Sequence, residues 1–124
     1  MFLFMDRYKE RLKEKMDAFV SEVFLISKLF PKEEIYITVA QLKRAALSII
    51  LNYIEGYARF KKGNQLNFLE ISYGSLKEVK YLLYFSMKQK FLPEQNYRDL
   101  MVRLDEIAAM LWTEVSSLTA ALKE

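Results

Sequence analysis

Residues 97–122, YRDLMVRLDEIAAMLWTEVSSLTAAL, carry apolar side chains at spacings that alternate between four and three positions. This alternation lines the apolar residues along one stripe of an α-helix and is typical of a helix that packs along its whole length in a bundle. The stripe consists of Tyr97, Met101, Leu104, Ala108, Leu111, Val115, Leu118 and Leu122. The segment therefore predicts the last helix of an all-α domain.

Another long amphipathic helix is predicted near the start of the chain. Its apolar positions again recur at spacings of three and four, and Pro31 ends it because proline cannot continue a helix. These positions are Tyr8, Leu12, Met16, Phe19, Val23, Ile26 and Phe30.

A second helix is predicted from about Thr38 to about Phe60. Thr38 and Gln41 have the spacing of a capping box, and Ile37 and Leu42 are placed to form a hydrophobic staple around it.

The next break is predicted at residues 61–64, KKGN. Gly63 suits the left-handed position after a helix, and Asn64 can cap a third helix from about Gln65 to about Lys90. Pro93 and Glu94 then make a favourable start for the fourth helix. Four helices with short connections predict one domain over residues 1–124, an all-α, up-down-up-down antiparallel four-helix bundle.

The composition of this 124-residue chain excludes several classes of fold and of functional site. Hydrophobic residues make up 52%, which is enough to offset the entropy cost of folding and excludes global disorder. Three Gly and two Pro are too few for the regular turns of a β-sandwich. The absence of Cys and His excludes disulfides, Cys/His zinc sites and Ser-His-Asp triads, so we expect no catalytic residue, no metal and no cofactor.

Localisation is predicted to be cytoplasmic. The apolar opening, residues 1–5, is too short for the core of a signal peptide and is followed at once by mixed charges. Since no apolar run approaches the roughly 18 residues of a membrane span, no membrane partner is expected.

The second predicted helix is unusually apolar. Residues 45–54, AALSIILNYI, are apolar at eight of ten positions, which is more than one bundle face can use. Its polar residues form one narrow stripe, at steps of three and four: Gln41, Arg44, Ser48, Asn52, Glu55 and Arg59. Two interpretations stay open: a thin window to solvent, or a hydrogen-bonded network that faces a neighbouring subunit.

The third predicted helix bears on this choice. Gly74 lies in a helix interior, where glycine costs about 1 kcal/mol relative to alanine, so close helix contact is a plausible compensation. An antiparallel pair of helices would bring Ser48 level with Ser75 and Arg44 level with Glu78, which predicts an Arg44–Glu78 ion pair.

Four ordered motifs carry a resemblance to a known family. They are FPKEE (residues 30–34), TVAQLKRAALSI (38–49), NYIEGYAR (52–59) and FLEISYGSLKE (68–78). In order and spacing this set resembles the four-helix bundle proteins encoded by intervening sequences inside bacterial 23S rRNA genes. The resemblance covers less than half of the chain. It implies a homo-oligomer, a ring of five, and kinship with the accessory variability protein of diversity-generating retroelements, which binds nucleic acid and a reverse transcriptase.

The sequence departs from the family pattern by added bulk at Ile50, Leu51 and Tyr53, which affects subunit packing more than the fold. No catalytic residue is carried over from the family. The residues expected to form a structural or interface network are Gln41, Arg44, Ser48, Asn52, Glu55, Ser75 and Glu78.

A basic end is predicted from the antiparallel topology. The net charge is +3, with the positive charge concentrated in residues 31–92 and residues 93–124 net acidic. The turn between the second and third helices lies at the same end as the start of the first, which gathers Arg7, Lys9, Arg11, Arg59, Lys61 and Lys62. With Tyr8, Tyr57 and Phe60 interleaved, this end has the composition to contact phosphates and stack on bases, although Asp6 and Glu10 dilute it.

Three functional hypotheses follow. The first is a non-enzymatic oligomeric bundle that binds RNA through the basic end. The second is a scaffold that docks a partner enzyme, such as a reverse transcriptase, on exposed aromatic residues such as Tyr84, Trp112 or Tyr97. The third, an enzyme that works through a Glu55–Glu78 carboxylate pair, has little support, because paired acids on helices are usually structural.

Overall fold

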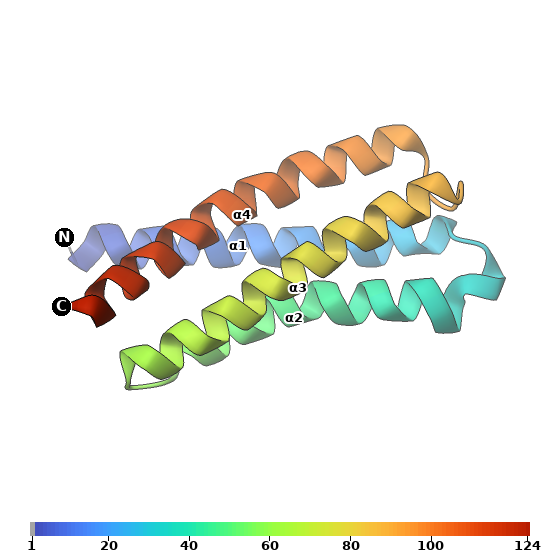
Figure 1. Ribbon diagram of the computed structural model, residues 1–124. Coiled ribbons are helices and arrows are strands. Elements are labelled where there is room, and N and C mark those ends of the chain that lie inside the picture. The colour runs from blue at the N-terminus through green and yellow to red at the C-terminus, as the bar shows by residue number, and fades with distance from the viewer. Residues whose placement is uncertain (1) are drawn as a thin grey trace.

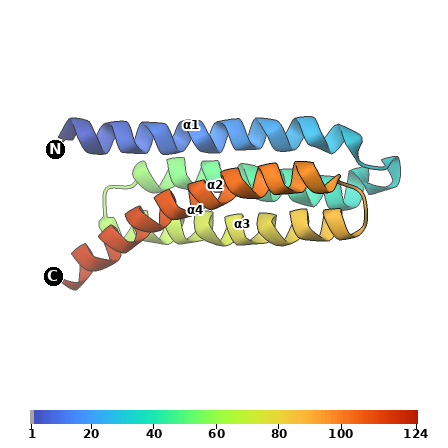
Figure 2. The same cartoon turned by 90° about the horizontal axis from the view of Figure 1, so that it is seen from above.

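Four long helices run alternately up and down in the computed structural model, which describes the backbone of residues 2–124 and the side chains of residues 6–124. They are α1 (Phe2–Ile26), α2 (Ala40–Tyr57), α3 (Lys62–Lys88) and α4 (Glu94–Lys123), and the described residues contain no strand. The predicted all-α fold is therefore confirmed. Both chain ends and the α2–α3 turn lie at one end of the bundle, and the other two connections lie at the opposite end (Figures 1 and 2). Met1, the first residue of the apolar opening, lies outside the described residues.

One continuous core fills the space between the helices. Each helix buries most of its apolar stripe. In the fourth stripe Leu104, Leu111 and Val115 are less than 9% exposed, whereas Leu122 at its end is 48% exposed. Three or four buried side chains on every two turns are what the spacing of an amphipathic helix requires. Helices α2 and α3 pack more extensively against each other than any other pair.

The connection between α1 and α2 differs from the prediction. A 3₁₀ turn at Ser27–Leu29 precedes Pro31, and a further 3₁₀ turn at Lys32–Glu34 leads into a π-helical turn at Ile35–Val39. Thr38 is therefore inside helical backbone and does not cap α2; its hydroxyl donates a 2.6 Å hydrogen bond to the Glu34 carboxylate. The predicted capping box and staple are wrong, since Ile37 is 66% exposed and does not cover Leu42.

The α2–α3 turn lies three residues earlier than predicted, at residues 58–61 instead of 61–64. Helix α2 ends at Tyr57 and α3 begins at Lys62, so Gly63 and Asn64 already belong to the first turn of α3. The left-handed position predicted at Gly63 is wrong, because no glycine among the described residues has a positive φ. That conformation is found at Lys90, with φ 64°, in the connection between α3 and α4.

The close approach of α2 and α3 occurs at Gly56. A Cβ atom there would lie 3.2 Å from the Gln65 carbonyl oxygen and 3.3 Å from side-chain atoms of Phe68 and Leu69. Gly74 makes no close helix contact within the chain, because a Cβ atom there would meet nothing within 4 Å. Within the single chain, glycine is therefore needed where the two helices converge toward their turn, near Gly56.

Candidate functional site

Polar side chains of α2 and α3 form a hydrogen-bonded row along the seam between these two helices. At one end of the row, Gln41 Nε2 donates a 2.7 Å hydrogen bond to Glu78 Oε2. Arg44 donates to Gln41 Oε1 at 3.1 Å and does not reach Glu78. The predicted Arg44–Glu78 ion pair is therefore wrong: Gln41 lies one turn before Arg44 and takes its place beside the carboxylate.

The middle of the row confirms the predicted register of the two helices. The hydroxyl groups of Ser48 and Ser75 share a 2.7 Å hydrogen bond, and Asn52 Nδ2 donates at 2.9 Å to both the carbonyl and the hydroxyl oxygen of Ser48. Deeper in the seam, Ser72 donates a 2.6 Å hydrogen bond to the Ile49 carbonyl oxygen. These small polar residues join α2 to α3 without leaving a buried polar atom unpaired among the described side chains.

The row lies at the surface of the single chain. Gln41, Arg44 and Glu78 are exposed, and Ser48, Ser75 and Asn52 are half-buried. Exposed apolar side chains on the same two helices, Leu51 (58%) and Ile71 (44%), are not covered by the chain itself. The row and the apolar side chains beside it are therefore accessible on the single chain.

Glu55 lies in the half of α2 away from Glu78. Its carboxylate forms an ion pair with Arg59, whereas Glu78 is bound by Gln41. The structure therefore does not bring together the two acids of the third hypothesis.

The six predicted phosphate-binding cations are all placed toward the end of the bundle that carries the α2–α3 turn, where the first helix begins (Figure 1). Arg7, Lys61 and Lys62 are exposed there. Arg11 lies on the side of α1 that faces Glu106 of α4. The pKa of Glu106 is lowered mainly by its hydrogen bond with Lys15 and to a smaller degree by the charge of Arg11. Part of the charge of Arg11 is therefore offset by an acid.

Lys9 and Arg59 are partly engaged within the chain. Lys9 Nζ lies 4.1 Å from the centre of the Tyr57 ring, and the Arg59 guanidinium lies 4.9 Å from the centre of the Phe68 ring. Gln65 also donates a 2.8 Å hydrogen bond to the Arg59 carbonyl oxygen. The contacts of Arg59 tie the α2–α3 turn to the start of α3.

The aromatic residues of this end differ in how far they are exposed. Phe60, between Arg59 and Lys61, is fully exposed. Tyr8 and Tyr57 are half-buried, and both use their hydroxyl groups on α4: Tyr8 donates to the Met110 carbonyl oxygen at 3.0 Å and Tyr57 donates to Glu114. Phe60 is therefore the most accessible of the three rings, whereas Tyr8 and Tyr57 are partly covered by the chain.

Glu114 was missed by the sequence reasoning. It is 3% exposed on α4 and accepts hydrogen bonds from Tyr53 Oη, at 2.5 Å, and from Tyr57 Oη. Burial raises the pKa of the Glu114 carboxyl, an effect that the two tyrosine hydroxyls and the nearby charge of Lys9 oppose. Its burial is indicated in the sequence by its position on the apolar stripe, three residues after Leu111 and one before Val115.

The aromatic residues named for a scaffold differ in accessibility. Trp112 is 54% exposed and packs its ring 5.4 Å from that of Tyr73, and Tyr84 is 45% exposed. Tyr97 is half-buried against the core. Two of the three are therefore accessible on the single chain.

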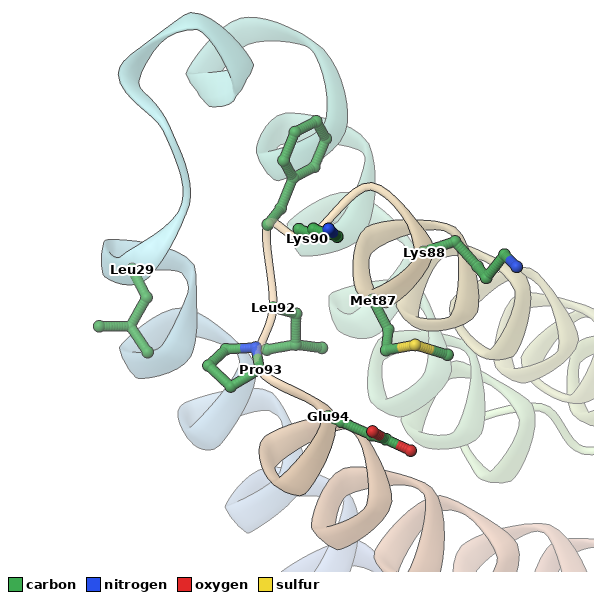
Figure 3. A pocket seen from close by; sticks show the side chains of 8 residues that line it. Leu29, Met87, Lys88, Lys90, Leu92, Pro93 and Glu94 are labelled. Atoms are coloured by element: carbon green, nitrogen blue, oxygen red, sulfur yellow. The ribbon is translucent and has the colours of Figure 1, made fainter.

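A hollow at the opposite end of the bundle has a mainly apolar lining. Leu29, Met87, Leu92 and Pro93 form its apolar lining around the α3–α4 connection, and Lys88, Lys90 and Glu94 lie on its rim (Figure 3). Among the described residues, no group of three or more acids is placed to hold a metal ion.

A four-helix bundle with a polar seam and a basic end is thus the class of protein that the structure defines. Residues 9–113 match the family described as 23S rRNA-intervening sequence protein, and the chain belongs to that family. The fold also matches the crystal structure of a protein of unknown function from the S23 ribosomal protein family of Bacteroides thetaiotaomicron. The TM-score is 0.82 at 19% sequence identity, over 88% of this chain and 98% of the other. No curated protein matches the sequence. None of the helices described between residues 2 and 123 has the length and apolar composition that crossing a bilayer requires.

Proposed function

We propose that the protein is a non-enzymatic, cytoplasmic, oligomeric bundle that binds RNA through its basic end. The observation that carries this proposal is Phe60, a fully exposed aromatic ring within the basic turn Arg59-Phe60-Lys61-Lys62. A large apolar ring left wholly in water between cations is what a protein needs in order to stack on an unpaired base while it contacts the flanking phosphates. Membership of the family named after 23S rRNA-intervening sequences supports an RNA ligand.

Three exposed cations contribute the electrostatic part of this binding. Lys61 and Lys62 extend the turn and Arg7 lies on the neighbouring helix at the same end. Each phosphate contact releases counterions from the RNA, so affinity falls as salt rises. Lys9 and Arg59 contribute less, because each already contacts an aromatic ring or an acid of the chain.

The oligomeric part of the proposal is a homo-oligomer, a ring of five, as the family resemblance implies. The polar row from Gln41 to Glu55 on α2, with Ser75 and Glu78 on α3, would form part of the subunit interface. Support comes from the exposed apolar side chains beside the row, Leu51 and Ile71, which a neighbour would remove from water. A ring would multiply the basic end around one axis and strengthen RNA binding through multivalency. We also propose that the protein is related to the accessory variability protein of diversity-generating retroelements.

The test is a binding titration with a structured 23S rRNA fragment and an unrelated RNA of equal length, at several salt concentrations. The variant Lys61→Glu/Lys62→Glu reverses two exposed charges at the basic end. The control Lys88→Glu/Lys90→Glu reverses two exposed charges in the turn at the opposite end. We expect a steep salt dependence, loss of binding at least about tenfold in the first variant and unchanged binding in the control.

Sedimentation of both variants shows whether assembly is preserved. Equal loss of affinity in the two variants would indicate a general charge effect, and undiminished affinity of Lys61→Glu/Lys62→Glu would overturn the RNA interface. A preference for the rRNA fragment over the unrelated RNA would add sequence or shape recognition to the phosphate contacts.

A second candidate function is a scaffold for a partner enzyme such as a reverse transcriptase, without direct RNA contact. The exposure of Trp112 and Tyr84 on the single chain favours it. Recovery of one defined protein partner after nuclease treatment, and its loss in Trp112→Ala, would support this function.

A further inference from the structure

A buried carboxylate lies in the half of the bundle that carries the basic end. Glu114 belongs to the second half of α4, which runs toward the same end as the α2–α3 turn and the start of α1 (Figures 1 and 2). Its two carboxylate oxygens accept hydrogen bonds from Tyr53 and Tyr57. Among the side chains of residues 6–124, no cation lies within ion-pair distance of this acid. Its charge is therefore balanced from a greater distance.

Lys9 of α1 is the cation whose charge acts on Glu114. Burial raises the pKa of the Glu114 carboxyl, and the two tyrosine hydroxyls and the charge of Lys9 act in the opposite direction. Tyr57 contacts both groups, because its hydroxyl donates to the carboxylate and the Lys9 ammonium lies 4.1 Å from the centre of its ring. When Glu114 is ionised, the ring and the carboxylate together hold the ammonium over Tyr57.

The groups that face Glu114 come from two other helices. Tyr53 and Tyr57 approach it from α2, and Lys9 approaches it from α1. Tyr8 of α1 lies near both tyrosines, and its hydroxyl is bound to the Met110 carbonyl oxygen. Within the described part of the chain, no charged group of α3 acts on Glu114.

The surroundings of Lys9 leave it within reach of a ligand. Lys9 is half-buried in a hollow between α1 and α2, which Asp6, Glu10 and Lys13 also line. Glu10 pairs with Lys13 at 3.4 Å, and Asp6 is exposed. The chain thus holds Lys9 mainly through Tyr57 and, beyond its hydroxyl, through Glu114.

We propose that Glu114 controls how far Lys9 takes part in RNA binding, so that RNA binds more tightly when Glu114 carries a proton. This inference rests on the proposed function. With Glu114 ionised, an RNA phosphate must draw Lys9 away from Tyr57, which leaves a buried carboxylate without its cation. With Glu114 neutral this cost is absent, and Lys9 is free to contact a phosphate. Glu114 is thus a positioning residue that acts through Lys9.

Thermodynamic linkage gives the sign of the effect. Since protonation of Glu114 strengthens RNA binding, RNA binding must in turn favour the protonated acid and take up a proton. Affinity should therefore rise as the pH falls through the pKa of folded Glu114, which burial places above its ordinary value of 4.5. The chain contains no His, whose titration would otherwise fall between mildly acidic and neutral pH.

The first test measures the affinity of the full chain for the structured 23S rRNA fragment at several values of pH and salt. As the pH falls from about 8 to about 5.5, we expect wild-type affinity to rise at least about fivefold. The salt dependence should steepen by about one phosphate contact. Glu114→Gln, which keeps the site neutral, should bind with the higher affinity throughout, and Lys9→Gln with the lower affinity throughout.

Asp6→Asn is the matched control, because it removes an exposed acid that lines the same hollow. It should change RNA affinity by the same factor at every pH. The α-amino group of a protein also titrates in this range. It is present in every variant, so its effect cancels when the wild type is compared with Glu114→Gln.

The second test needs no RNA. A ¹³C NMR titration of the glutamate carboxyl carbons measures the pKa of Glu114 in the wild type and in Lys9→Gln. We expect a higher pKa in Lys9→Gln, because the ionised acid loses its cation. Lys88→Gln, which removes an exposed cation at the opposite end of the bundle, should leave this pKa unchanged.

The outcomes separate this inference from the proposed function. Absence of RNA binding at every pH would overturn the proposed function and this inference with it. RNA binding with the same pH dependence in the wild type and Glu114→Gln would overturn this inference alone. An unchanged Glu114 pKa in Lys9→Gln would also overturn it, whether or not RNA binds, because Lys9 would then not balance the buried charge.

Discussion

The hydroxyl group of Tyr53 on α2 lies 2.5 Å from a carboxylate oxygen of Glu114 on α4, and both side chains are almost fully buried. Tyr57, one turn later on α2, donates to the other oxygen of the same carboxylate. One acid thus ties the second half of α2, which leads into the basic turn, to α4. Two charge-assisted hydrogen bonds in a dry environment offset part of the cost of burying the carboxylate.

We predict that Glu114→Leu destabilises the protein by about 2 kcal/mol, because it leaves two tyrosine hydroxyls without their partner. Glu114→Gln should be at least as stable as the wild type at neutral pH, since the amide can accept from one tyrosine and donate to the other while it removes a buried charge. Urea denaturation of the two variants checks both values. Equal stability of Glu114→Leu and the wild type would show that the tyrosines find other partners.

The same residue predicts a pH dependence of stability. Burial raises the pKa of folded Glu114 above its ordinary value of 4.5, so the folded chain holds this proton more tightly than the unfolded chain. The contribution of the group is full below pH 4.5 and is lost as the pH rises through the folded pKa. The free energy of unfolding of the wild type should therefore fall relative to that of Glu114→Gln between mildly acidic and neutral pH. A difference that is independent of pH in this range would contradict the assignment.

The tyrosines predict a second loss at alkaline pH. Burial and the bonds to Glu114 raise the pKa values of Tyr53 and Tyr57 above their ordinary value of 10.0, so stability should begin to fall once unfolded tyrosine ionises near that pH. Tyr53→Phe should reduce this loss, as measured by thermal unfolding across the alkaline range.

The two helical glycines should respond in opposite directions to alanine. Gly74→Ala should stabilise the protein by about 1 kcal/mol, because alanine favours the helix and its Cβ meets open space. Gly56→Ala gains the same propensity, but its Cβ would press on the Gln65 carbonyl oxygen at 3.2 Å, so we expect a net loss of about 1 kcal/mol. Thermal unfolding of both variants provides the comparison. If Gly74→Ala instead weakens assembly, Gly74 lies at a subunit interface.

Asn52→Leu tests whether the polar row faces a neighbour. All the hydrogen bonds of Asn52 go to Ser48 on its own helix, so the fold should lose no more than about 0.5 kcal/mol. Under the proposed assembly the sedimentation coefficient should change, since the neighbour loses a polar partner. Unchanged sedimentation would leave the row as a window to solvent.

Phe60→Ala should weaken RNA binding about tenfold without changing its salt dependence, because stacking is lost while the phosphate contacts remain. Tyr81→Ala, an exposed aromatic residue on the far half of α3, is the matched control. Equal affinity of Phe60→Ala and the wild type would remove the stacking contact from the proposed interface.

The helices themselves could be predicted from the sequence because periodic burial is a local property. The alternation from Tyr97 to Leu122 defines α4, and the match of Ser48 with Ser75 follows once α2 and α3 are antiparallel. Their ends could not be predicted equally well. Thr38 and Gly63 have the composition of a cap and a turn, but the π-helical turn and the earlier position of the α2–α3 connection place both inside helical backbone.

The sequence by itself determined the all-helical fold, the order of the helices and the gathering of basic residues at one end, because spacing and topology are enough to specify them. Only the tertiary structure decided which side chains remain free there. Tyr57 and Tyr8 are held by Glu114 and the Met110 carbonyl, far away in sequence, whereas Phe60 has no such partner and stays in water. A hydrogen bond between residues 57 positions apart depends on how α2 packs against α4, and no local pattern encodes that distance.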